Sequence, residues 1–146
     1  MKIFLIGFYA LMCAVAVSLH AQSEEPRLLL YHTNTDHGGG TNQWWLPLDR
    51  LEQLPKWRPE MGNEPTLSLM NAIKIGKKWI ASKGVGTGDV DEIVLRPVHP
   101  EEIRFRSCFY YRIKFSVAPY ANHLTCIVLM DGTVLEPTLH GKPLAK

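Results

Sequence analysis

The sequence contains few cysteines, no block of like charges and none of the common catalytic motifs. Its 16 basic and 14 acidic residues are interspersed, so neither a nucleic-acid-binding stripe nor a polybasic membrane patch is indicated. It also lacks the Gly-x-Ser-x-Gly elbow of hydrolases, the His-Glu-x-x-His zinc pair and the Cys-Gly-x-Cys context of cysteine proteases. We therefore predict no catalytic residues and no cofactor, and we favour a protein that is not an enzyme.

The N-terminal residues have the three-part pattern of a secretory signal. A lysine follows the initial methionine, Ile3–Leu19 carries no charge, and His20–Ser23 ends the apolar run with small and polar residues. We predict a signal peptide over residues 1–21 and a mature start at Gln22 or Glu24. An uncleaved anchor is the alternative, because the run approaches the roughly 20 residues needed to cross a bilayer. No second such run follows, so we expect a secreted or periplasmic protein with no membrane contact after cleavage.

Residues 22–64 read as a polar lead followed by a tryptophan-containing segment. Gln22–Asn42 shows neither hydrophobic period and carries three consecutive glycines, so we expect much of it to be mobile. Leu28–Tyr31 fits a short edge strand within this lead. The leucines and tryptophans of Trp44–Trp57 recur at near-helical spacing around two prolines, which predicts a helix of one or two turns.

The clearest element is an amphipathic helix over about Ser68–Lys83. Its apolar residues recur at three- and four-residue steps, and lysines take the other face. Ser68 or Thr66 can cap its start, and Gly84 can supply a left-handed stop. Gly76 lies in the apolar stripe, where glycine costs about 1 kcal/mol relative to alanine, so we expect close approach to a sheet there.

After this helix the hydrophobic period changes to two. The predicted strands are Glu92–Val98, Ile103–Val117, Leu124–Met130 and Thr133–Pro137. Asp131-Gly132 is typical of a two-residue type I′ hairpin, which would pair Val128 with Leu135. We therefore predict an α+β domain over residues 65–146, in which one amphipathic helix packs on a four-stranded antiparallel meander sheet. The carboxylates of Asp89–Glu92 are expected in a turn.

Strand parity predicts that Cys108 and Cys126 are not joined by a disulfide, although an exported chain with two mature cysteines would suggest one. The hairpin register directs Cys126 toward the helix. The aromatic side chains of the preceding strand form its core side, which leaves Cys108 on the opposite face. Side chains on opposite faces cannot reach the Cβ separation of about 3.5–4.5 Å that a disulfide requires. A β-bulge between Ser107 and Tyr110 would reverse the facing of Cys108.

Four segments together suggest a family. They are the helix Leu69–Lys83, the strand Glu92–Val98, the aromatic strand with Phe109–Ile113 and the string Val128–Val134. This arrangement, over about residues 65–137, resembles PepSY-like or cystatin-like units and small exported bacterial proteins of unknown function. The resemblance implies non-covalent binding outside the cytoplasm, sometimes the restraint of a protease, and it implies no catalytic residues.

Trp44, Trp45 and Trp57 are the candidate partner-binding residues, because paired tryptophans can stack on sugars or anchor a protein partner. We favour a covering role over part of a small sheet, because the leucines between them need a surface to bury against. His32, Asp36 and His37 could hold zinc or copper if their segment folded around the ion. No fourth ligand follows at a recognised spacing, so we predict a solvated loop and no metal site.

From these features we predict an exported, non-catalytic binding module that engages a protein partner or a protease, with an envelope or secreted protein as the class of partner and no nucleic acid. The alternative is a small enzyme or ligand carrier with a pocket between the helix and the sheet. A deep pocket lined by converging polar groups would favour the alternative, whereas a filled helix–sheet interface would favour the binding module.

Overall fold

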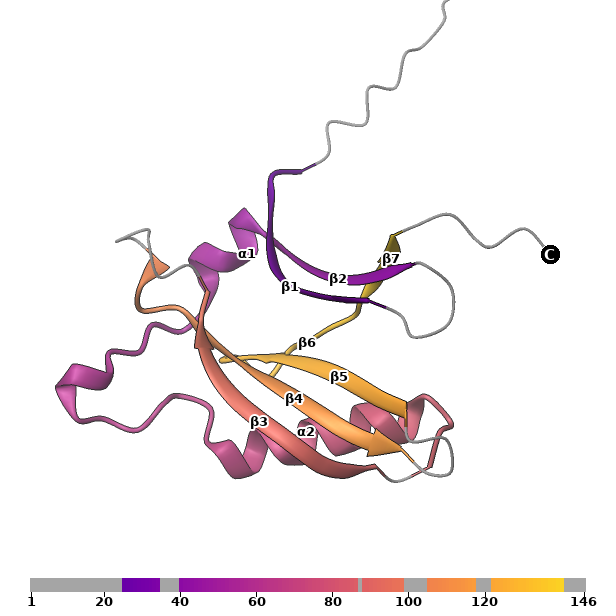
Figure 1. Ribbon diagram of the computed structural model, residues 1–146. Helices are drawn as coiled ribbons and strands as arrows, with labels where there is room; N and C mark the ends of the chain where they lie inside the picture. The colour runs from indigo at the N-terminus through magenta and orange to yellow at the C-terminus, as the bar shows by residue number, and fades with distance from the viewer. Residues whose placement is uncertain (1–24, 35–39, 87, 99–104, 118–121, 141–146) are drawn as a thin grey trace, which may run out of the picture.

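The computed structural model describes residues 25–34, 40–86, 88–98, 105–117 and 122–140. In these residues the chain forms two antiparallel sheets, two α-helices and a 3₁₀ helix (Figure 1). The elements are β1 (Arg27–Asn34), β2 (Thr41–Pro47), α1 (Leu48–Gln53), η1 (Pro59–Met61), α2 (Leu69–Ser82), β3 (Asp89–Pro97), β4 (Phe109–Val117), β5 (Asn122–Leu129), β6 (Val134–Leu135) and β7 (Thr138–His140). The predicted α+β class is confirmed, whereas the single sheet that we expected is one of two.

Helix α2 forms as its sequence predicts. The Ser68 hydroxyl caps it by accepting a hydrogen bond from the Asn71 N–H at 3.3 Å, and Gly84 ends it with a left-handed φ of 70°. A Cβ added at Gly76 would lie 2.9 Å from Cζ of Phe115 and 3.1 Å from Cδ1 of Ile113. The glycine therefore permits the close approach of helix and sheet that the sequence predicts.

The large sheet is the predicted meander, with strand order β3-β4-β5-β6. Its second strand is shorter than expected, because β4 begins at Phe109 and the chain before it turns, with the Cys108 N–H donating to the Phe105 carbonyl at 2.9 Å. The first strand begins earlier than expected, at Asp89, so the carboxylates of Asp89–Glu92 lie in β3 and the turn expected there is wrong.

The hairpin between β5 and β6 differs from the predicted two-residue turn. The Leu129 N–H donates to the Thr133 carbonyl at 2.8 Å, and the Gly132 N–H donates to the Leu129 carbonyl at 2.9 Å. With Gly132 at a φ of 86°, this is a longer loop that closes on a left-handed glycine. The Asp131 carboxylate accepts the Thr133 N–H at 2.9 Å and stabilises this loop. Val128 consequently pairs with Val134, and the predicted pairing with Leu135 is wrong by one residue.

The small sheet is built mostly from the segment that we expected to be a lead. Its strand order is β1-β2-β7, so Arg27–Asn34 forms an edge strand with a register shift between Leu29 and Tyr31, and the edge strand expected at Leu28–Tyr31 is confirmed. The short helix expected near the tryptophans begins only at Leu48, after Pro47, and Trp44 and Trp45 lie in β2. Figure 1 shows the small sheet on the side of the large sheet opposite α2.

The large sheet is therefore covered on both faces, and two hydrophobic cores result. The helix-side core lies between α2 and the sheet and contains Ala72, Trp79, Ile80, Tyr111, Ile113, Phe115, Val117, Cys126, Val128 and Met130. The inter-sheet core lies between the two sheets and contains Trp44, Leu46, Leu51, Leu54, Val98, Phe105, Cys108, Tyr110, Ile127 and Leu129. From α1, Arg50 pairs with Asp131 and donates to the Thr133 hydroxyl at 2.8 Å, which ties the small-sheet layer to the β5–β6 loop.

The two buried cysteines lie in different cores, so the predicted placement on opposite faces is confirmed. The parity argument survives its register error because the pairing of Cys126 with Ile113 of β4 sets its face independently of the β5–β6 loop. Cys108 accepts a hydrogen bond from the Lys56 ammonium, with 2.9 Å between Nζ and Sγ.

Candidate binding surface

The structure separates the three tryptophans that the sequence suggested. Trp44 is 1% exposed in the inter-sheet core, with its ring 5.5 Å from that of Tyr31, so it has the covering role and offers no surface to a partner. Trp45 points to the other side of β2, is half-buried, and lies under the Arg27 guanidinium at 5.2 Å. Trp57 is half-buried and packs edge-on against Phe109 at 5.0 Å. These side chains do not form one aromatic site.

The suggested metal ligands are not brought together in the described residues. His32 is exposed on β1, while Asp36 and His37 lie outside the described residues. Within the described part of the chain, no group of three or more histidine, cysteine, aspartate or glutamate side chains is arranged to hold a metal ion.

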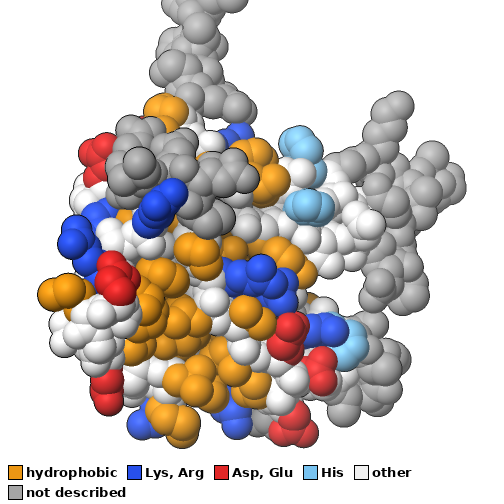
Figure 2. Space-filling view, turned by 60° about the vertical axis from the view of Figure 1, so that its left-hand side comes forward, with side chains coloured by type: hydrophobic (Ala, Val, Ile, Leu, Met, Phe, Trp, Pro, Cys, Tyr) orange, Lys and Arg blue, Asp and Glu red, His pale blue; other side chains and the backbone are white. Residues whose placement is uncertain are grey.

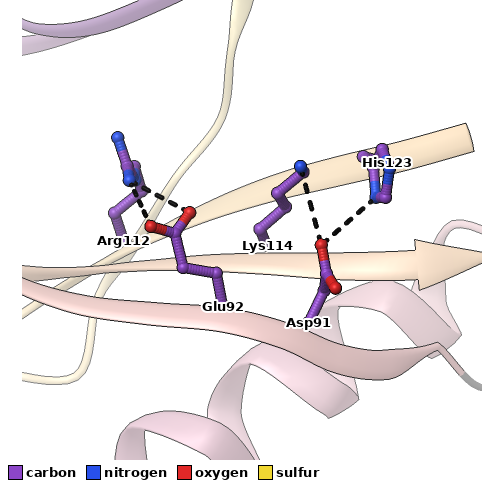
Figure 3. A network of polar contacts seen from close by, with 5 residues as sticks. All are labelled: Asp91, Glu92, Arg112, Lys114 and His123. Carbon is purple, nitrogen blue, oxygen red and sulfur yellow. Dashed lines mark hydrogen bonds and ion pairs between the residues drawn. The ribbon is translucent and has the colours of Figure 1, made fainter.

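The clearest polar constellation is a charged row on the face of the large sheet opposite α2 (Figure 3). It consists of Asp91 and Glu92 from β3, Arg112 and Lys114 from β4, and His123 from β5. One nitrogen of Arg112 lies 3.0 and 3.1 Å from the two carboxylate oxygens of Glu92. Asp91 lies 3.5 Å from Nζ of Lys114 and 3.6 Å from Nδ1 of His123.

Strand alternation places this row beside the inter-sheet core. Tyr110, Arg112 and Lys114 share one face of β4 because residues two apart point the same way. At one end Tyr110 is buried under β1, and its hydroxyl donates to the Leu30 carbonyl at 3.1 Å. Burial raises the pKa of Tyr110, and the charges of Arg96 and Arg112 offset part of that rise. The small sheet thus covers the Tyr110 end of the face, and the charged row continues from it.

Arg112 lies at the boundary between the covered and the open part of this face. Its side chain is 16% exposed and its guanidinium lies 4.9 Å from the centre of the Tyr31 ring, which is close enough for a cation–π contact. Further along, the side chains of Lys114, Asp91 and His123 are 36, 43 and 43% exposed. These three side chains are therefore accessible at the surface, while Arg112 is held in place by Tyr31 of the small sheet and by Glu92.

A signal for this row is present in the sequence. Opposite charges stand at facing positions of neighbouring strands, since Glu92 pairs with Lys114 in the register and Arg112 is the next residue on that face. Recognising this requires the β3–β4 register, which the expected turn at Asp89–Glu92 obscured. His123 belongs to the row because β5 places it opposite Ser116, on the same face as Lys114.

Three large apolar side chains are also exposed. Met61, Leu69 and Met70 are 65, 45 and 62% exposed, and they belong to η1 and the start of α2. Figure 2 turns the left-hand side of Figure 1 forward and shows hydrophobic side chains gathered over the middle of that face. Exposed apolar area of this kind marks interaction surfaces in many proteins.

Comparisons with known proteins do not indicate a role for this surface. Among the described residues, no helix is both long enough and apolar enough to cross a membrane, and the predicted signal peptide lies outside those residues. No family model, no curated protein and no solved structure matches this chain.

Proposed function

We propose that the protein is an exported, non-catalytic binding module that engages a protein partner, an envelope or secreted protein or a protease, through the charged row. The observation that carries this proposal is the row itself. Its complementary charges are partly exposed, and they lie on a sheet face next to a well-packed core. Sites on strands of a scaffold are held more precisely than sites on loops. The resemblance to PepSY-like and cystatin-like units supports the same class of function.

The filled interface between α2 and the large sheet supports a binding module over a ligand carrier. Ile80, Ile113, Phe115 and Val128 are at most 1% exposed there, and the Gly76 backbone approaches Phe115 so closely that a methyl group would not fit without a shift. Close packing of this kind supports the binding module, because the alternative function requires a pocket between helix and sheet.

The charged row is suited to selecting a partner. Alternating positive and negative side chains reward a surface with the matching order of charges and penalise one that places like charges together. Arg112 is pre-oriented by Tyr31 and Glu92, so less side-chain entropy is lost when a partner binds it. Exposed charges of this kind act mainly on association rate and specificity, so binding should weaken with added salt.

A photo-cross-linking experiment in the exporting cell tests the proposal. A photoreactive residue at Thr125, which pairs with Lys114 across the strands, should give an adduct with one envelope or secreted protein, and the same residue at Lys78 on α2 should not. With the identified partner purified, Lys114→Glu should weaken binding at least tenfold, because it reverses one charge of the row, whereas Lys78→Glu should not weaken it. Equal affinity of the two variants would contradict the proposal.

Export itself is tested separately. Mass spectrometry of exported protein should find a mature N-terminus at Gln22 or Glu24. An intact Met1 in the membrane fraction would show that the predicted signal peptide is an anchor.

A further inference from the structure

Strand β3 is an edge of the large sheet, because it pairs with β4 on one side and ends the strand order. The Val98 N–H donates to the Cys108 carbonyl at 2.8 Å, which fixes which residues of β3 bond to β4. By antiparallel alternation Arg96 and Val94 direct their backbone groups to β4, whereas Leu95 and Ile93 direct theirs outward. No described residue bonds to these outward groups, so they are available to another strand.

The centre of this edge has little protection against pairing. Proteins shield edge strands with prolines, bulges, lysines or covering segments. In β3 the register irregularity lies between Val90 and Glu92, and Pro97 lies at the far end. The stretch between them is regular, and Ile93 and Leu95 are half-buried on the α2 side.

The sequence of β3 is complementary to itself when two copies run antiparallel about Val94. In that register Ile93 of one copy lies opposite Leu95 of the other, so the outward backbone groups meet in hydrogen-bonded pairs. Glu92 lies opposite Arg96 of the second copy, and the two-fold axis repeats this ion pair. Arg96 is exposed and makes no ion pair with any described residue, while the Glu92 side chain is 47% exposed.

Neighbouring registers lose this complementarity. Outward backbone groups also meet if the axis passes through Ile93 or through Leu95. With the axis at Ile93, Glu92 lies opposite Val94. With the axis at Leu95, Arg96 lies opposite Val94, and Ile93 faces Pro97, which has no N–H to donate. Of these three registers, only the one with its axis at Val94 combines hydrogen-bonded backbone pairs with both ion pairs.

We infer that β3 is a homodimerisation edge, at which two copies of this chain pair antiparallel about Val94 and their large sheets join into one continuous sheet. Facing residues of antiparallel strands share a face, so the two α2 helices lie on the same side of the joined sheet. The charged rows of both copies then lie together on its other side. A bivalent partner surface would bind such a dimer with gained avidity, but dimerisation itself does not depend on the proposed function.

Sedimentation velocity of the exported, purified protein over a concentration series tests the inference. A monomer–dimer equilibrium is expected. Arg96→Glu should raise the dimer dissociation constant at least tenfold, because it places like charges opposite each other twice. Lys78→Glu, with the same charge change on α2, should leave the constant unchanged. The urea midpoint of each variant confirms that it is folded.

A symmetric cross-link tests the register. Val94→Cys should form a disulfide-linked dimer on mild oxidation, because each Val94 faces its own copy across the axis in a non-hydrogen-bonded pair, in which facing Cβ atoms come closest. Lys78→Cys should give no such dimer. A protein that is monomeric at every concentration, an unchanged dissociation constant in Arg96→Glu, or a Val94→Cys variant that stays uncross-linked would overturn the inference.

Discussion

Replacing Trp44 measures whether the small sheet and the large sheet fold as one unit. Trp44 is 1% exposed in the core between them, and its indole contacts the Tyr31 ring. Truncating a buried tryptophan to alanine costs about 3–5 kcal/mol, because apolar contacts are lost and a cavity remains. Against a total stability of about 5–15 kcal/mol for a typical domain, Trp44→Ala should remove a large part of the free energy of unfolding.

Trp44→Phe refines the measurement. The Trp44 Nε1 hydrogen is buried and has no hydrogen-bond partner among the described residues. An unpaired buried donor costs about 1–3 kcal/mol, so its removal should offset much of the packing lost with the smaller ring. We expect Trp44→Phe to lose less than half of what Trp44→Ala loses. Trp45→Ala is the matched control, because Trp45 is half-buried on the outer side of the same strand and should lose least.

The assay is urea unfolding followed by far-ultraviolet circular dichroism and by tryptophan fluorescence, with midpoint and slope compared between variants. Coincident transitions are expected, since both sheets contribute to the inter-sheet core. An unchanged midpoint in Trp44→Ala would refute the reasoning, because it would mean that the small sheet contributes nothing to the stability of the rest.

Three further predictions concern the opposite core and its surroundings. Trp79→Ala should lower the free energy of unfolding by about 3–5 kcal/mol, because Trp79 is 9% exposed on α2 and its Nε1 donates to Glu136 at 2.8 Å. An unchanged urea midpoint would show that the helix face is wrongly assigned. Burial raises the pKa of Cys126 to about 12, so iodoacetamide at about pH 8 should not label it in folded protein, whereas denatured, unreduced protein should show free Cys108 and Cys126 thiols. Burial alone would raise the pKa of the Glu136 carboxyl, but hydrogen bonds from Lys83 and Trp79 and the charge of Lys83 lower it on balance. The stability from this pairing is present above the unfolded pKa of about 4.3 and is lost as the pH falls through the lower folded value, so Glu136→Gln should flatten the acid dependence of the urea midpoint.

The sequence predicted the elements whose signals are local. For α2, the apolar stripe, the Ser68 cap and the Gly84 stop all lie within the helix or next to it, and the predicted ends differ from the observed ones by one residue. The meander was predicted because the period of two is clear in the aromatic strand β4 and each strand lies next to its partner in the chain. The length predicted for the loop after β5 was wrong. The Asp131 side chain stabilises a longer turn, and the Asp-Gly pair alone does not distinguish that turn from type I′.

The small sheet was missed in part because its third strand, β7, comes from far along the chain. β2 pairs with β7 in a register that joins Thr41 to His140, and no local pattern indicates a partner so far along the chain. One signal was nevertheless present. Cys126–Met130 is a continuous apolar run, which is typical of a strand buried on both faces, whereas a sheet with a single helix on it would show alternation. Such a run indicates a second covering layer, and the segment around Trp44 and Leu46 contributes to it.

The position of the charged row follows from how unequally the two faces of the large sheet are covered. The face toward α2 is apolar along β4 from Phe109 to Val117, and the other face changes from Tyr110 to charged residues within a single step of the alternation. Charged groups cannot be buried without partners, so the change marks the limit of what the small sheet covers. Arg112 can be largely buried at this boundary because Tyr31 and Glu92 both contact its guanidinium. The core around Trp44 and the orientation of Arg112 therefore depend on the same layer, and loosening that layer would release the residue that the proposed binding surface holds most firmly.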